Sequence, residues 1–204
     1  MNTSTRSATR TLFVAVRAMI LATVALGIIY PLIITGIGQL TMPGRADGSM
    51  VRTADGRTAG SRLIGQSFIN AKGNPLPRYF QSRPSAAGAG YDGASSSGSN
   101  LGPNNKDLST TIAQRKAQIA KFNHVAPAQV PPDAVTASGS GLDPDISTAY
   151  ADIQINRVAQ ARHVSSARIV AIVAANTRGP SLGLLGEARV NVLQVNLALD
   201  HMKG

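Results

Sequence analysis

The longest apolar stretch of the chain lies near its N-terminus, where residues 18–44 carry no charged side chain. As an α-helix, residues 18–40 would span about 35 Å, enough for a hydrocarbon core about 30 Å thick. A secretory signal peptide also has a basic start, but its apolar region covers only about 7 to 15 residues before a small-x-small cleavage site. The longer run here predicts an uncleaved membrane helix over residues 12–37, after a short tail of residues 1–11.

Within this segment, Tyr30-Pro31 predicts a kink, because proline removes one backbone hydrogen bond from a helix. Small residues allow another helix to approach closely, and a polar side chain can form a contact with it. The alternative explanation is that Gly and Pro are simply commoner in membrane helices than in soluble ones. We favour a helix that packs on a membrane partner. Its candidate boundary and packing residues are Arg17, Gly27, Tyr30, Pro31, Gly36 and Gln39.

Residues 38–204 have the pattern of one soluble domain, either α/β or α+β, in which helices dominate the second half. Residues 41–60 mix glycines with charged residues, which indicates turns or a short hairpin. Prolines on both sides restrict residues 79–82 to strand or turn geometry.

Helical periodicity begins after residue 105. Apolar side chains recur on one face of residues 107–123, which predicts an amphipathic helix with a basic outer face. A second helix is expected to start with Asp143 as its N-cap and Pro144 at its first position, and to end near His163.

Ser165 is expected to cap a third helix that runs to Thr177, where Gly179-Pro180 terminates it. The valines and leucines of residues 190–199 then predict a closing strand or a packed segment.

Residues 85–105 contain five glycines and a single charged residue, Asp92, which is the composition of a flexible linker. Tyr91-Asp92 interrupts this simple composition, and residues 100–103 lead directly into the predicted helix. We therefore favour an ordered surface loop whose glycines allow the backbone to approach a partner closely.

The charge of the chain adds an orientation to this arrangement. The 204 residues include 20 basic and 10 acidic side chains, and three of the basic ones, Arg6, Arg10 and Arg17, precede the apolar segment. Because Lys and Arg near a span stay on the cytoplasmic side, the N-terminus is expected in the cytoplasm and the domain outside the membrane. The other basic residues are scattered among the acidic ones, without the dense stripe or stacking aromatics of a nucleic-acid binder.

Candidate chemistry is sparse. The chain has no cysteine and only three histidines, far apart in sequence, which excludes a thiol nucleophile and leaves little for a metal site. Residues 88–93 match the dinucleotide fingerprint G-x-G-x-x-G, but no buried strand precedes them and no helix follows. A Ser-His-Asp triad assembles in space rather than in sequence, so a hydrolase stays open as the alternative.

Seven segments resemble, in order, the C subunit of the Kdp potassium-transporting ATPase, a P-type pump complex of bacteria and archaea. The resemblance covers nearly the whole chain beyond the N-terminal tail. Two positions depart from the family pattern: Asp145 stands where His or Asn is common, and Ala188 where Pro is usual. The seven segments are YPLIITGIGQ (30–39), GSRLIGQSF (60–68), YFQSRPSAAG (79–88), YDGASSSGSNLGPNNKDL (91–108), VPPDAVTASGSGLDPDIS (130–147), QINRVAQAR (154–162) and LGEARVNVLQVNLALD (185–200).

This resemblance implies an accessory subunit that stabilises the assembly of separate ATP-hydrolysing and potassium-translocating chains, with a small single-span subunit as a further partner. It also implies a role as a catalytic chaperone that raises the affinity of the pump for ATP. No tightly bound cofactor is implied for this chain, and ATP only within the complex. Gln154 and Arg157 are the candidates for a nucleotide-linked motif; the alternative is a helix-surface glutamine and a salt-bridging arginine.

We therefore expect a non-catalytic, single-pass subunit in the cell inner membrane, whose outer domain caps the translocating subunit near the potassium entrance. The alternative is a membrane-anchored extracytoplasmic hydrolase or ligand-binding module, for which a pocket holding His124 or His163 beside a serine would be the sign. The candidates for partner contact are Tyr91, Asp92, Ser97, Ser99, Asn100, Gly102, Ser140 and Asp143.

Overall fold

The computed structural model describes the backbone of residues 3–202 and the side chains of residues 7–202. The chain divides into two compact units, Met1–Met50 and Val51–Gly204, which are described separately. The side chain of Arg6, one of the three arginines used for the orientation, lies outside the described residues.

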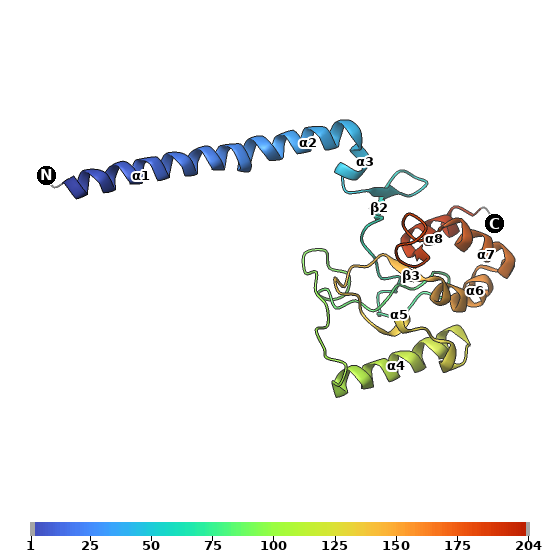
Figure 1. The fold of residues 1–204 in the computed structure, drawn as a ribbon. Coiled ribbons are helices and arrows are strands. Elements are labelled where there is room, and N and C mark those ends of the chain that lie inside the picture. Colours follow the sequence, from blue (N-terminus) through green and yellow to red (C-terminus); the bar gives the residue numbers. More distant parts are fainter. Residues whose placement is uncertain (1–2, 203–204) are drawn as a thin grey trace. The chain divides into compact units, whose positions relative to one another are not determined.

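The first unit is a long helix followed by one short turn of helix, α3 (Pro43–Ala46). The long helix is continuous through α1 (Thr3–Ala22), the π-helical η1 (Thr23–Ile29) and α2 (Tyr30–Thr41), and it runs without a sharp bend in Figure 1. Residues Ser7–Thr41 have a mean hydropathy of 2.4 over their most apolar window, none of it buried in the protein. By length and composition this helix can cross a membrane.

The π-helical segment is the local response to Pro31. Proline has no N–H, and its ring excludes the carbonyl four residues earlier, so the α-helical hydrogen-bond pattern is interrupted there. The N–H of Tyr30 donates instead to the carbonyl of Ala25, five residues back. The effect of this proline is therefore a change of hydrogen-bond register, a common accommodation in membrane helices, and the predicted kink is wrong.

The second unit begins with a two-stranded sheet, β1 (Met50–Arg52) and β2 (Thr58–Ser61). The hairpin predicted between residues 41 and 60 is therefore confirmed. Residues 62–105 follow as a long connection without helix or strand, which Figure 1 shows in cyan to green, and it leads into α4 (Lys106–Asn123). Asn105 caps α4 by accepting from the N–H groups of Asp107 and Leu108.

A three-stranded antiparallel sheet and three helices form the rest of the domain. The strand order is β3 (Asp145–Ser147), β5 (Arg189–Asn191) and β4 (Thr177–Arg178). The helices are α6 (Thr148–Arg162), α7 (Ser166–Ala175) and α8 (Val192–Asp200). Two shorter elements, η2 (Pro127–Gln129) and α5 (Pro132–Val135), connect α4 to the sheet. This is the mixed, helix-rich domain that the sequence predicts.

The start of the second predicted helix is wrong by several residues. Asp145–Ser147 form β3, where Ile146 pairs with Val190 and both side chains are buried, so the burial of Ile146 on the sheet overrides the helix-start pattern at Asp143-Pro144. Ser147 is the N-cap of α6, and its hydroxyl accepts from the N–H of Tyr150. Asp143 instead closes a turn by accepting from the N–H of Asp145.

The ends of the first two predicted helices agree with the sequence. The helix of residues 107–123 is confirmed as α4, and α6 ends at His163 as expected. Both His124 and His163 adopt the left-handed conformation, with φ of 56°, in which helices commonly terminate. Ser165 caps α7 as predicted, but the helix stops at Ala175 rather than at Thr177, because Thr177 pairs with Val190 as the start of β4. The closing segment is a short strand, β5, followed by helix α8.

Candidate functional site

The two predicted partner-contact segments lie against each other. The N–H of Ser97 donates to the carbonyl of Ser140 at 3.0 Å, and the Ser85 hydroxyl donates to the carbonyl of Gly141 at 2.6 Å. Gly141 has a φ of +67°, and a Cβ there would lie 2.6 Å from the carbonyl oxygen of Ser97. Residues 85–105 are thus an ordered loop packed on the 138–143 turn through close backbone contacts, and the linker interpretation is wrong.

Tyr91 anchors the start of this loop. Its hydroxyl donates to the carbonyl of Arg83 at 2.8 Å, and its N–H donates to the Ser85 hydroxyl at 2.8 Å. The ring packs on Gly65, where a Cβ would lie only 2.3 Å from the ring edge. Burial raises the pKa of Tyr91 to about 12, so the hydroxyl stays a hydrogen-bond donor at neutral pH. Arg83 also pairs with Asp143 at 2.9 Å, which ties the loop to the turn.

The tip of the loop is exposed. The Asp92 carboxylate accepts from the N–H of Ala94, and Asn100 has a φ of 52°. The tip offers polar groups to solvent, which suits contact with another surface. The exposed candidates in this tip are Asp92, Ser97, Ser99, Asn100 and Gly102, and Ser140 on the turn is exposed as well.

Gln154 and Arg157 lie in the interior, so the alternative of a helix-surface glutamine and a salt-bridging arginine is wrong. Gln154 has no exposed surface and Arg157 has 4%. Gln154 accepts from the N–H of Gln81 at 2.7 Å and donates to the carbonyl of the same residue at 3.2 Å. It thereby supplies to the backbone of Gln81 the two hydrogen bonds that a neighbouring strand would make. Residues 79–82 are neither helix nor strand in the structure.

Arg157 binds the same segment. Its guanidinium donates to the carbonyls of Tyr79, at 3.0 Å, and Pro77, and to the side chain of Asn123 at 2.9 Å. The group also donates to Gln154 and stacks 4.4 Å from the centre of the Phe122 ring. Burial lowers the pKa of Arg157 to about 10. No carboxylate pairs with it among residues 7–202.

Asn196 of α8 completes this arrangement from the other side. It accepts from the N–H of Phe80 at 2.8 Å and donates to the carbonyl of Phe80 at 2.9 Å. We call Gln154, Arg157 and Asn196 the polar clamp of residues 77–81. Sequence reasoning missed Asn196, because an asparagine within an apolar segment gives no sign of a distant backbone partner.

The two residues that depart from the resemblance have local surroundings. The Asp145 carboxylate pairs with Arg189 at 3.0 Å and accepts from the Asn191 side chain at 3.1 Å, both on the neighbouring strand. Ala188 lies beside these residues in a shallow depression that also includes Glu187. Asp145 therefore links β3 to β5.

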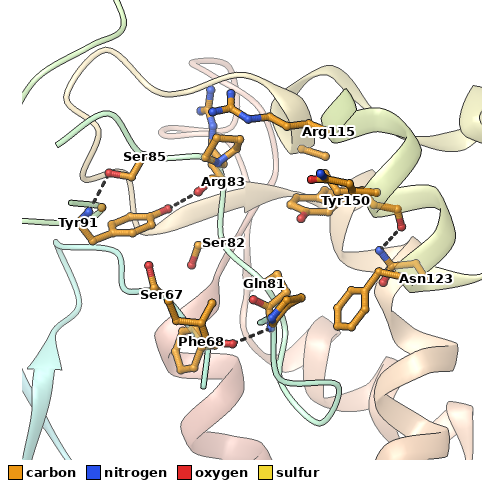
Figure 2. A pocket seen from close by; sticks show the side chains of 18 residues that line it. Ser67, Phe68, Gln81, Ser82, Arg83, Ser85, Tyr91, Arg115, Asn123 and Tyr150 are labelled. Carbon is orange, nitrogen blue, oxygen red and sulfur yellow. Dashed lines mark hydrogen bonds between the residues drawn. The ribbon is translucent and has the colours of Figure 1, made fainter. Parts of the chain in front are cut away.

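The described part of the chain provides no sign of hydrolytic chemistry. A cavity of about 350 Å³ is lined by Ser67, Ser82 and Ser85, but no histidine lines it (Figure 2). His124 ends α4 and lines another pocket, which no serine lines, and His163 ends α6. No cluster of three potential metal ligands is present among the described residues. The pocket that would have marked a hydrolase is thus not among those observed.

An apolar loop that the sequence analysis did not single out lies between β4 and β5. Leu182, Leu184 and Leu185 are 91%, 88% and 63% exposed, the first two being the most exposed large apolar side chains in the second unit. A backbone bridge between Ser181 and Leu185 closes the loop. We call residues 181–186 the leucine loop. In the sequence this loop is a run of leucines between glycines. The same pattern is equally compatible with a buried segment, so it does not predict an exposed loop.

The candidate residues of the first unit lie along one helix. Gly27 is in η1, while Tyr30, Pro31, Gly36 and Gln39 are in α2 and Arg17 is in α1. The Gln39 side chain donates to the Asp47 carboxylate at 3.0 Å, just past α3. A Cβ at Gly36 would meet nothing within 4 Å, so this side of the helix is open to a neighbouring helix.

These features define a class: proteins with one membrane-length apolar helix and a mixed, helix-rich domain. One protein-family model, described as "K+-transporting ATPase, c chain", matches residues 12–201. The chain belongs to this family of potassium-transporting ATPase C chains.

Curated relatives agree with the family. The potassium-transporting ATPase KdpC subunit of Kineococcus radiotolerans is 51% identical over 181 residues, which are 89% of this chain and 88% of the relative. The KdpC subunit of Beijerinckia indica is 51% identical over 183 residues, 90% of this chain and 89% of its own. That of Mycobacterium bovis is 47% identical over 194 residues, 95% and 99% of the two chains.

Proposed function

We propose that this chain is the single-span accessory subunit of an ATP-driven potassium uptake complex, and that it stabilises the assembly without catalysing a reaction itself. The observation that carries the proposal is the family match over residues 12–201. It is supported by the apolar helix Ser7–Thr41, whose most apolar window is not buried by any of the described residues. Such a helix is stable only in lipid or against other membrane helices.

We propose a cytoplasmic N-terminus and an extracytoplasmic domain. Arg10 and Arg17 precede the apolar core of the helix, and positive residues are retained on the cytoplasmic side. A reporter enzyme fused after Gly204 tests the orientation. Alkaline phosphatase is active only outside the cytoplasm, and its fusion is expected to be active. Activity of a second reporter that works only in the cytoplasm would contradict the proposed orientation.

The proposed partners are the potassium-translocating subunit and the ATP-hydrolysing subunit, with a small single-span subunit as a third. Two surfaces of the domain are suited to contact them. One is the exposed tip of residues 92–102 with the adjoining turn, and the other is the leucine loop. Exposed leucines are costly in water, and their burial contributes about 1.5–3 kcal/mol each, so the leucine loop is the stronger of the two surfaces.

An effect of this chain on the affinity of the pump for ATP would act through the membrane subunits. The hydrogen-bonding groups of Gln154 and Arg157 are engaged within the domain, so a nucleotide would have to displace the polar clamp to reach them. Coupling instead requires that the chain contact two states of the pump differently. Purified chain alone is therefore expected not to bind ATP through these two residues.

Co-purification of the complex tests the assembly role. The double variant Leu182→Ser and Leu184→Ser is expected to reduce recovery of the partner subunits, whereas a control at exposed Leu63 and Val170 is expected to retain it. Full recovery and full potassium transport in cells that lack this chain would contradict the accessory role. Full recovery with the leucine-loop variant alone would reject only the surface.

A further inference from the structure

A cavity of about 350 Å³ lies on the side of the domain where α4 meets the long connection (Figure 2). Its volume is near the lower end of the range for small-molecule sites, about 300–1,000 Å³. Its walls come from four parts of the chain: residues 67–91, α4, Ala134 of α5 and Tyr150 of α6. None of the predicted functions uses this cavity.

The polar end of the cavity is cationic. Arg83 and Arg115 both line it, no aspartate or glutamate does, and Figure 2 shows the two guanidinium groups at the same end. Arg83 forms an ion pair with Asp143 of the neighbouring turn. Arg115 donates to the carbonyl of Val135 at 3.1 Å, and no carboxylate pairs with it among residues 7–202. Two cations at the same end of the cavity, of which only Arg83 is paired with a carboxylate, favour an anion beside them.

One buried donor at this cavity lacks a partner in the described part of the chain: the Nε of Arg83 is buried without a hydrogen bond. The hydroxyl of Tyr150 is a further donor, on a residue that is only 3% exposed and lines the cavity. Burial raises the pKa of Tyr150, so this hydroxyl keeps its proton and remains a donor. A buried donor without an acceptor costs about 1–3 kcal/mol, which an acceptor in the cavity would relieve.

Two amide side chains at the cavity are already engaged. The Gln81 amide donates to backbone carbonyls, including that of Phe68 at 3.1 Å, and the Asn123 amide donates to the carbonyl of Ile119 at 2.9 Å. The apolar part of the wall includes Phe122 and Pro75. The cavity thus combines a cationic, donor-rich end with an apolar body.

We propose that this cavity binds a small organic anion, a carboxylate carried on an apolar body, with Arg115 and the Tyr150 hydroxyl as its principal donors. The anionic oxygen atoms accept from the guanidinium and hydroxyl groups, and the body of the ligand packs against Phe122. A potassium ion does not suit the cavity, because cation sites need oxygen acceptors and this end presents donors and positive charge.

Benzoate is the probe for this proposal, and neutral benzamide, inorganic phosphate and ATP are its comparators. The full chain in uncharged detergent is titrated at constant ionic strength by calorimetry, with empty micelles as the blank. One saturable benzoate site per chain is expected, with weaker binding of phosphate, which lacks the apolar body, and no saturable binding of benzamide. Absence of saturable benzoate binding, or benzamide binding as tight as benzoate, would overturn the proposal.

Three variants locate the site. Arg115→Gln is expected to weaken benzoate binding at least tenfold, because it removes a charged donor. Tyr150→Phe, which retains the ring and removes only the hydroxyl, is expected to weaken it about threefold to tenfold. Lys116→Gln removes the same charge from the next position of α4, outside the cavity lining, and is expected to bind as the parent does.

Circular dichroism and thermal unfolding of each variant establish that it is folded before its affinity is compared. Unchanged benzoate affinity in both Arg115→Gln and Tyr150→Phe would place the benzoate elsewhere and overturn the assignment. Competitive displacement of benzoate by ATP at a lower concentration would also overturn it, because the cavity would then be a nucleotide site. The family assignment and the assembly role stand independently of each of these outcomes.

Discussion

Replacement of Arg157 by methionine is the most informative test of the polar clamp. Methionine retains much of the length and the apolar stem of arginine, but it removes four hydrogen bonds to acceptors within the domain. A hydrogen bond to a charged group contributes about 1.5–3 kcal/mol, although the four share one guanidinium and are not additive. The loss of the favourable bonds is partly offset, since the buried charge itself no longer has to be desolvated.

The net cost expected for Arg157→Met is therefore about 3–5 kcal/mol, as for the loss of one partner from a buried charged group. For a domain of 150–250 residues, each kcal/mol lowers the melting temperature by about 2–4 °C. We expect a decrease of about 10 °C or more with the variant still folded at 25 °C, because domains are stable by about 5–15 kcal/mol.

The measurement is thermal unfolding of the full chain in detergent, followed by circular dichroism. Arg178→Met is the matched control, because Arg178 is exposed and makes a single long hydrogen bond, 3.3 Å, to Gln194. This control is expected to change the free energy of unfolding by less than about 1 kcal/mol. If Arg157→Met melts within 2–3 °C of the control, the clamp does not stabilise the domain and the reasoning is refuted.

Three further outcomes are expected. Gly141→Ala should destabilise the domain by about 3 kcal/mol in urea unfolding, because φ is positive there and the new Cβ would clash with a backbone carbonyl. Gly139→Ala is the control and should not destabilise it, because the space around Gly139 is open. Equal effects of the two substitutions would contradict the close packing of loop and turn. Because the pKa of Tyr91 is raised to about 12, the unfolded state loses the Tyr91 proton at a lower pH than the folded state does. The free energy of unfolding should therefore fall by about 1.4 kcal/mol per pH unit between about pH 10 and pH 12. Tyr91→Phe should make that decline shallower, and an unchanged slope would argue against a buried hydroxyl. Ser147→Ala should cost about 1–2 kcal/mol by removing the cap of α6, and a loss below 0.3 kcal/mol would place the helix start elsewhere.

Local patterns were sufficient where a local contact decides the structure. The helix of residues 107–123 has its apolar period, its cap and its end in one stretch of sequence, and Ser165 caps the next helix through bonds within three residues. The predicted start of α6 was wrong because a distant contact decides the structure there. Asp143-Pro144 is a good helix start taken alone, but the pairing of Ile146 with Val190, 44 positions away, extends the chain there.

The candidate sites show the same division. Composition is sufficient to predict that two segments, residues 91–105 and the 138–143 turn, lie on the surface. Their contact with each other depends on backbone hydrogen bonds and close approaches between glycines and serines that are distant in sequence. The burial of Arg157 could not be predicted, because its acceptors are backbone carbonyls, which every residue carries. The cavity between α4 and Tyr150 likewise arises only from tertiary packing.

The polar clamp also determines which part of the domain can fold early during synthesis. Phe80 receives its two backbone hydrogen bonds from Asn196, 116 positions later in the chain. During synthesis, the segment around Phe80 is complete long before the side chain that orders it exists. Contacts of such large separation form late and slowly. The segment around Phe80 therefore remains without these two hydrogen bonds until the last helix has been made, and we expect chains interrupted before residue 196 to be more readily degraded by proteases.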